Sequence, residues 1–188
     1  NYSIFLAEVA STFNENLLLD HLINISETKD EKLFLLEKYL NNISATVYRQ
    51  VMFAEFEMLT HSKVENGEVL TPDTLCKLYR DIYQKYWGDE MVVDEEESYT
   101  WARVPHFYYN FYVYQYATGF AASEALAEKV KSEGKTAVKK YIDFLKAGSS
   151  DYPINILKNA GVDMNSPEPI LAVTKKMNQI IDEMENLI

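Results

Sequence analysis

Two glutamates on one expected helix are the first residues that could do chemistry. Glu8 and Glu15 lie in a helical pattern over residues 3–25, and their spacing puts them two turns apart, roughly 10 Å along the axis. Glu8 has five apolar neighbours: Phe5, Leu6, Ala7, Val9 and Ala10. Because burying an unpaired carboxylate costs several kcal/mol, we expect a cation or a strong hydrogen-bond donor opposite Glu8. The alternative is an amphipathic helix with Glu8 at its solvent edge.

A histidine and several tyrosines form the second candidate group. Five tyrosines fall within the eleven residues from His106 to Tyr116. On a helix that begins at His106, Tyr109 and Tyr116 share its face, and Tyr112 lies beside that face. The other large aromatic residues of the stretch are expected in the core: Phe107, Phe111 and Tyr114. A cleft where a peptide carbonyl develops negative charge needs such hydroxyl donors; an aromatic helix packed into a bundle is the alternative.

The elements that must position these groups have helical patterns. No stretch alternates between apolar and polar residues over a useful length, so the sequence predicts an all-α fold, a helical bundle. After the first helix we expect a long helix from an N-cap at Asp30 to Met58, with a bend at Asn41-Asn42, and then a loop over 61–70. The next helix is expected to begin at the Thr71 N-cap and Pro72 and to run to Trp87, where Gly88 ends it, followed by a solvated acidic loop over 89–98. The remaining expected helices cover 106–132, 135–146, 154–160 and 168–184.

Length and composition limit the classes of function. The 188 residues are enough for a substantial core, and we expect a single helical domain over 1–188. A net charge of −11 argues against binding to nucleic acid or to an anionic membrane surface. The longest apolar runs are far too short to span a bilayer. Cys76 is the only cysteine and cannot form an internal disulfide, which favours the reducing cytoplasm.

Three stretches, in order along the chain, carry a resemblance to a known family. They are FLAEVASTFNE (5–15), PHFYYNFYVYQYATGF (105–120) and FLKAGSSDYPINILKNAGVDMNSPEPI (144–170). They resemble the third-ligand helix, the histidine- and tyrosine-rich helix and the C-terminal segment of the oligoendopeptidase F family, zinc metallopeptidases related to thimet oligopeptidase. The resemblance covers the whole chain. It implies the C-terminal half of a thimet oligopeptidase-like (zincin) catalytic domain, whose parent cleaves short peptides in the cytoplasm.

The same resemblance implies roles for individual residues. Glu8 matches the family's third zinc ligand, and Glu15 matches a second acidic residue that lies behind the ligands. His106, Tyr109 and Tyr116 match the catalytic groups that bind substrate carbonyls and stabilise the tetrahedral intermediate.

Two further tyrosines are candidates for substrate binding. The spacing from His106 differs from that of the thimet branch, so Tyr112 is kept beside the matched tyrosines. Tyr152 could reach a substrate from the flexible loop that contains Gly148. If Glu8 holds zinc and the tyrosines receive the oxyanion, we expect all of them to line one cleft, because the oxyanion also coordinates the metal.

One departure from the family pattern limits what this chain can do. Its three histidines are His21, His61 and His106, and none is followed by Glu, so the sequence has no His-Glu-x-x-His motif. That motif supplies two zinc ligands and the general base. We therefore expect this chain to be inactive and to lack zinc by itself. The first residue is Asn rather than Met, which with the resemblance suggests a fragment whose parent has a missing N-terminal part.

Other interpretations predict different partners. A non-catalytic all-α module that binds peptides or another protein would keep the same peptide-facing wall without the chemistry. A di-iron bundle needs Glu-x-x-His pairs, and the spacing from Glu57 to His61 is one residue too long. As a fragment, the chain is expected to expose an apolar face where the missing helices would pack, and such a face favours a homo-oligomer.

Overall fold

Helices are the only regular secondary structure in residues 3–188, the part of the chain that the computed structural model describes. This confirms the all-α prediction. The chain forms two compact units, one made of the residues up to Val47 together with Gln115–Ile188, the other of Tyr48–Tyr114. The single domain expected over 1–188 stays a prediction. No helix in the described range is long and apolar enough to cross a membrane.

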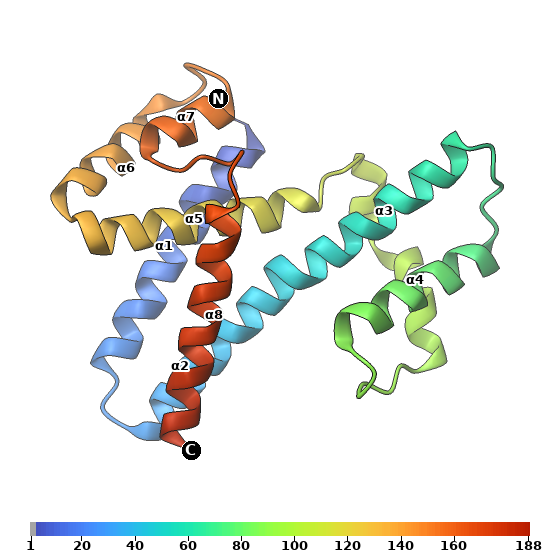
Figure 1. Ribbon diagram of the computed structural model, residues 1–188, viewed down its shortest axis with the longest axis horizontal. Helices are drawn as coiled ribbons and strands as arrows, with labels where there is room; N and C mark the ends of the chain where they lie inside the picture. The colour runs from blue at the N-terminus through green and yellow to red at the C-terminus, as the bar shows by residue number, and fades with distance from the viewer. Residues whose placement is uncertain (1–2) are drawn as a thin grey trace. The chain divides into compact units, whose positions relative to one another are not determined.

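The first unit is a bundle of six helices along the described chain (Figure 1). Within it α8 packs along α2, α1 packs against α2, and the two short helices α6 and α7 pack together. The bounds are α1 Ile4–Ile25, α2 Lys29–Ile43, α5 Tyr114–Glu133, α6 Lys135–Ala147, α7 Pro153–Ala160 and α8 Glu168–Leu187.

Helix α5, like α1 and α8, contributes to both apolar cores of this unit. Ala122, Ala125 and Leu126 of α5 pack with residues of α1, α6 and α7. Phe120 and Ala121 pack instead with residues of α1, α2 and α8. Small side chains let the neighbouring helices approach α5 closely, so this helix fixes where α1 lies.

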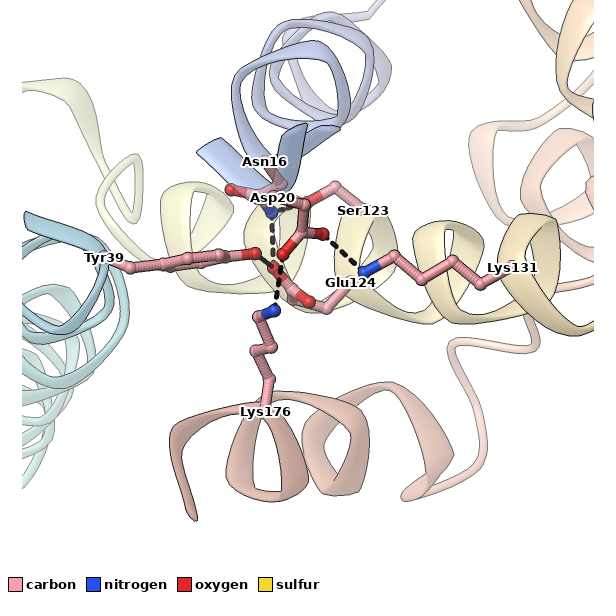
Figure 2. A network of polar contacts seen from close by, with 7 residues as sticks. All are labelled: Asn16, Asp20, Tyr39, Ser123, Glu124, Lys131 and Lys176. Atoms are coloured by element: carbon pink, nitrogen blue, oxygen red, sulfur yellow. Dashed lines mark hydrogen bonds and ion pairs between the residues drawn. The ribbon is translucent and has the colours of Figure 1, made fainter. Parts of the chain in front are cut away.

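A carboxylate is buried inside this bundle (Figure 2). Glu124 of α5 is only 5% exposed. Its Oε1 accepts hydrogen bonds from Asn16 Nδ2 of α1 at 2.5 Å and from the Tyr39 hydroxyl of α2 at 2.6 Å. Burial raises the pKa of the Glu124 carboxyl, while the hydrogen bond from Tyr39 opposes that shift. Burial next to Glu124 also raises the pKa of Tyr39 far above its usual value, so Tyr39 stays a donor.

A second carboxylate extends the network to α8. Asp20 of α1 forms ion pairs with Lys176 of α8, at 2.6 Å, and with Lys131 of α5. The Lys176 ammonium also lies 4.7 Å from the centre of the Tyr39 ring. Four helices are therefore joined by one set of charge-assisted contacts, the stronger class of hydrogen bonds in proteins.

The second unit is built on α3 and α4, with two 3₁₀ segments packed onto them. α4 begins as predicted: Thr71 Oγ1 accepts from the Thr74 N–H, Pro72 is the first helical residue, and Gly88 ends the helix at a positive φ of 80°. The bounds are α3 Arg49–Glu65, α4 Pro72–Trp87, η2 Glu95–Arg103 and η3 Pro105–Tyr109, and the buried core residues are Met52, Phe53, Phe56, Tyr79, Ile82 and Val113.

Three details expected for residues 28–65 are wrong: a helix N-cap, a helix end and the position of a bend. The N-cap of α2 is Thr28 instead of Asp30, because the Thr28 hydroxyl accepts from the Glu31 N–H. Helical structure continues past Met58 to Glu65, so His61 lies on α3 and not in a loop. The irregular turn lies at Ser44–Tyr48, which is a π-helical turn, instead of at Asn41-Asn42.

The helix expected over 106–132 is also wrong in its first third. Pro105–Tyr109 is a short 3₁₀ segment, Asn110 and Phe111 have positive φ angles of 49° and 56°, and α5 begins only at Tyr114. Of the three aromatic residues expected in the core, Phe107 packs there, whereas Phe111 and Tyr114 are exposed. The turn at Asn110 and Phe111 interrupts the expected helix, so helical periodicity does not predict which of these aromatic side chains are buried.

The buried network makes a prediction about stability. Tyr39→Phe removes one of two donors to the buried Glu124 carboxylate, and we expect a loss of about 1–3 kcal/mol in the free energy of unfolding. Tyr141→Phe is the control, because Tyr141 is also buried but its hydroxyl accepts only a long hydrogen bond, 3.4 Å, from Asn14. Urea denaturation measures both. Equal losses in the two variants would contradict a special role for the Glu124 contact.

Candidate active site

Glu8 lies in the first half of α1, on a segment that is firmly packed. Leu6, Val9 and Phe13 around it are buried and belong to the core shared with α5, α6 and α7. The Glu8 side chain itself is half-buried. The helix backbone beneath the carboxylate is therefore fixed, while the carboxylate can reach the surface.

Gly119 of α5 packs closely against Glu8. A Cβ atom added at Gly119 would lie 3.1 Å from the Cβ of Glu8, which is tighter than ordinary contacts between side chains. Tyr116 lies three residues before Gly119, on the same side of α5 and about 4.5 Å along its axis. Tyr116 therefore lies about one helical turn along α5 from the point where Gly119 packs against Glu8.

The partner expected for Glu8 is not found among residues 3–188. The carboxylate has no hydrogen bond or ion pair with that part of the chain, and because Glu8 is half-exposed, water can solvate it. Glu15 is exposed two turns further along α1, where it accepts a 3.4 Å hydrogen bond from the Ser11 hydroxyl. The role of Glu15 behind the metal ligands stays a prediction.

His106, Tyr109 and Tyr112 lie together in the second unit. The His106 ring stacks on the Tyr112 ring with centroids 5.7 Å apart and an interplanar angle of 13°. Tyr109 lies 6.3 Å from His106 and 6.0 Å from Tyr112. Tyr109 is 64% exposed, whereas His106 and Tyr112 are half-buried. The three residues form an aromatic cluster.

A strained turn makes this cluster possible. Asn110 tolerates the left-handed conformation, but Phe111 rarely adopts it, and a non-glycine residue held there costs about 1–3 kcal/mol. The Phe111 N–H donates a 2.6 Å hydrogen bond to Oε1 of Glu57 on α3, and the Phe111 ring lies 4.7 Å from the His61 ring. These contacts from α3 stabilise the turn.

Tyr152 is the remaining candidate, and it lies just before α7. Its side chain is 78% exposed, and its N–H donates to Asp151 Oδ1 at 2.6 Å. The hydrogen bonds that Asp151 accepts from the Asn155 side chain and from the Tyr152 N–H lower the pKa of its carboxyl. The backbone at Tyr152 is therefore ordered while its hydroxyl is free to meet a ligand.

Comparison with known proteins decides the family. Residues 1–175 match peptidase family M3. The chain belongs to peptidase family M3. It is 56% identical over its whole length to oligopeptidase PepF of Bacillus subtilis and 47% identical to the plasmid oligoendopeptidase F of Lactococcus lactis subsp. cremoris.

Solved structures agree with this assignment to family M3. The chain matches oligoendopeptidase F from Enterococcus faecium with a TM-score of 0.93 and 42% identity, covering 99% of this chain and 36% of that one. A putative peptidase from Chlamydophila abortus gives the same TM-score at 43% identity, covering 100% of this chain and 32% of that one. This chain spans 28% of the Bacillus protein and 31% of the Lactococcus protein, about a third of an M3 relative.

A metal ion at Glu8 would need further ligands. Enzyme zinc sites use three protein ligands and an open position. Within residues 3–188 no three His, Cys, Asp or Glu side chains gather where they could hold a metal. Glu8 fits the chemistry of one ligand, since it offers a carboxylate oxygen that no other group engages in that range.

Sequence reasoning did not identify two residues that shape this region. Gly119 is the closely packed glycine opposite Glu8, and an isolated glycine inside a helical pattern is a known signal of close packing. Glu57 follows Phe53 at a four-residue spacing, so helical periodicity places this carboxylate on an apolar face, and it is 2% exposed. Helical periodicity could therefore have identified Glu57 as a carboxylate on an apolar face, but not the backbone N–H that it binds.

The crossing at Gly119 makes a prediction. Gly119→Val is expected to destabilise the chain by about 1–3 kcal/mol, because overpacking forces α1 and α5 apart at Glu8. Gly119→Ala should change stability much less, since a gain of about 1 kcal/mol in helix propensity offsets the tight contact. Urea denaturation of both variants measures this difference. A valine variant as stable as the original chain would show that the two helices separate freely.

Proposed function

We propose that this chain is part of a zinc-dependent oligoendopeptidase that hydrolyses peptide bonds in short peptides. The proposal is supported by the family match and by relatives named oligoendopeptidase F. The observation that carries it is the α1–α5 crossing, where Gly119, three residues after Tyr116, packs against the half-buried Glu8. A carboxylate that can hold a metal and a hydroxyl that can donate to an oxyanion belong together in peptide hydrolysis.

Glu8 is the zinc ligand in this proposal. When bound, zinc activates a water molecule and polarises the peptide carbonyl. The packing of Leu6 and Val9 and the contact with Gly119 fix the backbone that carries Glu8. A ligand held by rigid packing keeps its geometry without reorganising. Glu15, two turns further along α1, is proposed as the acidic residue behind the metal ligands.

The oxyanion side of the reaction is assigned to His106, Tyr109 and Tyr116. Their polar atoms are neutral or weakly acidic donors, which suit a carbonyl oxygen that develops negative charge. Tyr112, stacked on His106, and Tyr152, exposed just before α7, are assigned to binding of the peptide substrate.

The chain by itself is proposed to be inactive. It has no His-Glu-x-x-His motif, so two zinc ligands and the general base must come from other residues of a longer protein. The relatives, about three times as long as this chain, support that arrangement. We also propose a cytoplasmic location and short peptides as substrates. Exposed apolar side chains such as Leu18, Phe34 and Leu171 offer a surface for the remaining part of the protein or for self-association.

A metal-binding measurement tests the limit of this chain. Because zinc enzymes need three protein ligands and Glu8 supplies one, the isolated chain is expected to bind zinc no more tightly than a surface carboxylate does. Isothermal titration calorimetry with zinc chloride, compared with Glu8→Gln, measures this. Tight binding of one zinc per chain that depends on Glu8 would contradict the proposed division of ligands.

Activity of the complete enzyme tests the assigned tyrosines. Loss of an oxyanion donor lowers kcat by about a hundredfold or more elsewhere, so we expect such a fall from Tyr→Phe at position 109, 112 or 116. Tyr108→Phe is the matched control, because Tyr108 is 86% exposed next to the cluster and has no assigned role. Hydrolysis of a quenched fluorescent peptide measures kcat. Unchanged rates in all three variants would rule out the oxyanion role.

A further inference from the structure

We propose that Glu57 is a positioning residue, which holds the turn between Tyr109 and Tyr112 in the conformation that the reaction needs. This inference rests on the proposed function, because it concerns the same aromatic cluster. Glu57 does not belong to that cluster and is not expected to touch the substrate. Its effect passes through the backbone of Phe111.

The contact between Glu57 and the turn is buried. Glu57 is 2% exposed, and its Oε1 accepts the Phe111 N–H at 2.6 Å. Its second oxygen, Oε2, is buried and has no hydrogen-bond partner in the described part of the chain. A carboxylate kept in such a place is costly, and an apolar residue of similar size would normally stabilise a helix face better. The residue that breaks this packing rule is expected to have another purpose.

The turn needs the contact because its backbone is strained. Asn110 and Phe111 follow each other with φ angles of 49° and 56°. Two successive non-glycine residues in the left-handed region persist only where the surroundings hold them. The hydrogen bond from Phe111 to Glu57 satisfies the N–H that this reversal points toward α3.

The two ends of the turn are anchored separately. Before it, the Phe107 ring packs 5.5 Å from Phe53 and 5.3 Å from Phe56. After it, Val113 is completely buried. The centre of the turn is held by Glu57 and by the ring of His61. Glu57 thus sets the angle at which the segment with Tyr109 meets the segment with Tyr112.

That angle determines the stacking of the cluster. His106 and Tyr109 precede the turn and Tyr112 follows it, yet the His106 and Tyr112 rings are nearly parallel. If the turn relaxed toward ordinary φ values, the stack would open and the donors would move apart. A displacement of about 1 Å in a reacting group can cost a hundredfold in rate.

The test compares two variants of Glu57 in the complete peptidase. Glu57→Gln keeps an acceptor for the Phe111 N–H, and Glu57→Met removes it at similar size. We expect Glu57→Met to lower kcat by about tenfold to a hundredfold with a smaller change in KM, and Glu57→Gln to stay close to the original enzyme. Hydrogen exchange at the Phe111 amide should become fast in Glu57→Met alone.

A control on the same helix separates positioning from stability. Glu55 lies two residues earlier, accepts from Lys85 and Tyr86, and does not contact the turn. Glu55→Met should lower stability without changing kcat or the exchange of the Phe111 amide. If Glu57→Met does not fold, His61→Ala replaces it. His61 is exposed, so its loss spares the core, and we expect a smaller fall in kcat in the same direction.

The outcomes distinguish this inference from the proposed function. If Glu57→Met keeps its kcat while Tyr109→Phe and Tyr112→Phe lose theirs, Glu57 is not a positioning residue and the proposed function stands. Equal losses in Glu57→Gln and Glu57→Met would also overturn the inference, since the hydrogen bond would not be the cause. If the tyrosine variants keep their rates too, the oxyanion role proposed for the tyrosines is wrong and the inference falls with it.

Discussion

The first unit depends on one buried carboxylate, Glu124, and on the donors that surround it. A buried carboxylate without partners is strongly destabilising, so the helices that carry its donors must stay where they are. Asn16 fixes α1 and Tyr39 fixes α2 against Glu124, and the ion pair between Asp20 and Lys176 adds α8. Apolar packing can slide, but a set of directional bonds has one arrangement.

This constraint reaches Glu8 through the helices themselves. Glu8 and Asn16 are on α1, about 12 Å apart along its axis, and Gly119 and Glu124 are on α5, about 7.5 Å apart. Because both helices are stiff, fixing the Asn16–Glu124 contact also fixes the crossing where Gly119 meets Glu8. The bundle thereby holds a half-exposed carboxylate on a frame that cannot easily move, which is what a metal ligand requires.

The second unit uses a buried carboxylate in the same manner but for a loop. There Glu57 holds a backbone N–H rather than a side chain, and the element it stabilises is a turn with unfavourable φ angles. The aromatic core of Phe53, Phe56 and Phe107 gives the turn a base. In both units a buried carboxylate on an apolar helix face costs folding free energy but holds its hydrogen-bond donors in one arrangement. Both acids support elements that carry candidate site residues of a family M3 peptidase.

Local pattern was enough to determine much of this protein. Helical periodicity and end signals predicted α1, α4, α6, α7 and α8 to within one or two residues at most ends, because a helix forms from contacts between residues three or four apart. The three stretches around Glu8, His106 and Tyr152, taken together, were enough to indicate the family. Helix ends and family motifs depend on residues that are close in sequence, so they can be predicted without the tertiary structure.

Only the tertiary structure decided how the candidate site is built. The stretch from His106 reads as a helix, but Glu57, 54 residues away, captures the Phe111 N–H and reverses the backbone. Asn16 and Glu124 are 108 residues apart, and no local sequence pattern predicts their hydrogen bond. Gly119 reads as a weak point in a helix until Glu8 is seen against it. Each of these contacts depends on which residues far apart in sequence are brought together by tertiary packing, and local helix propensity does not determine that.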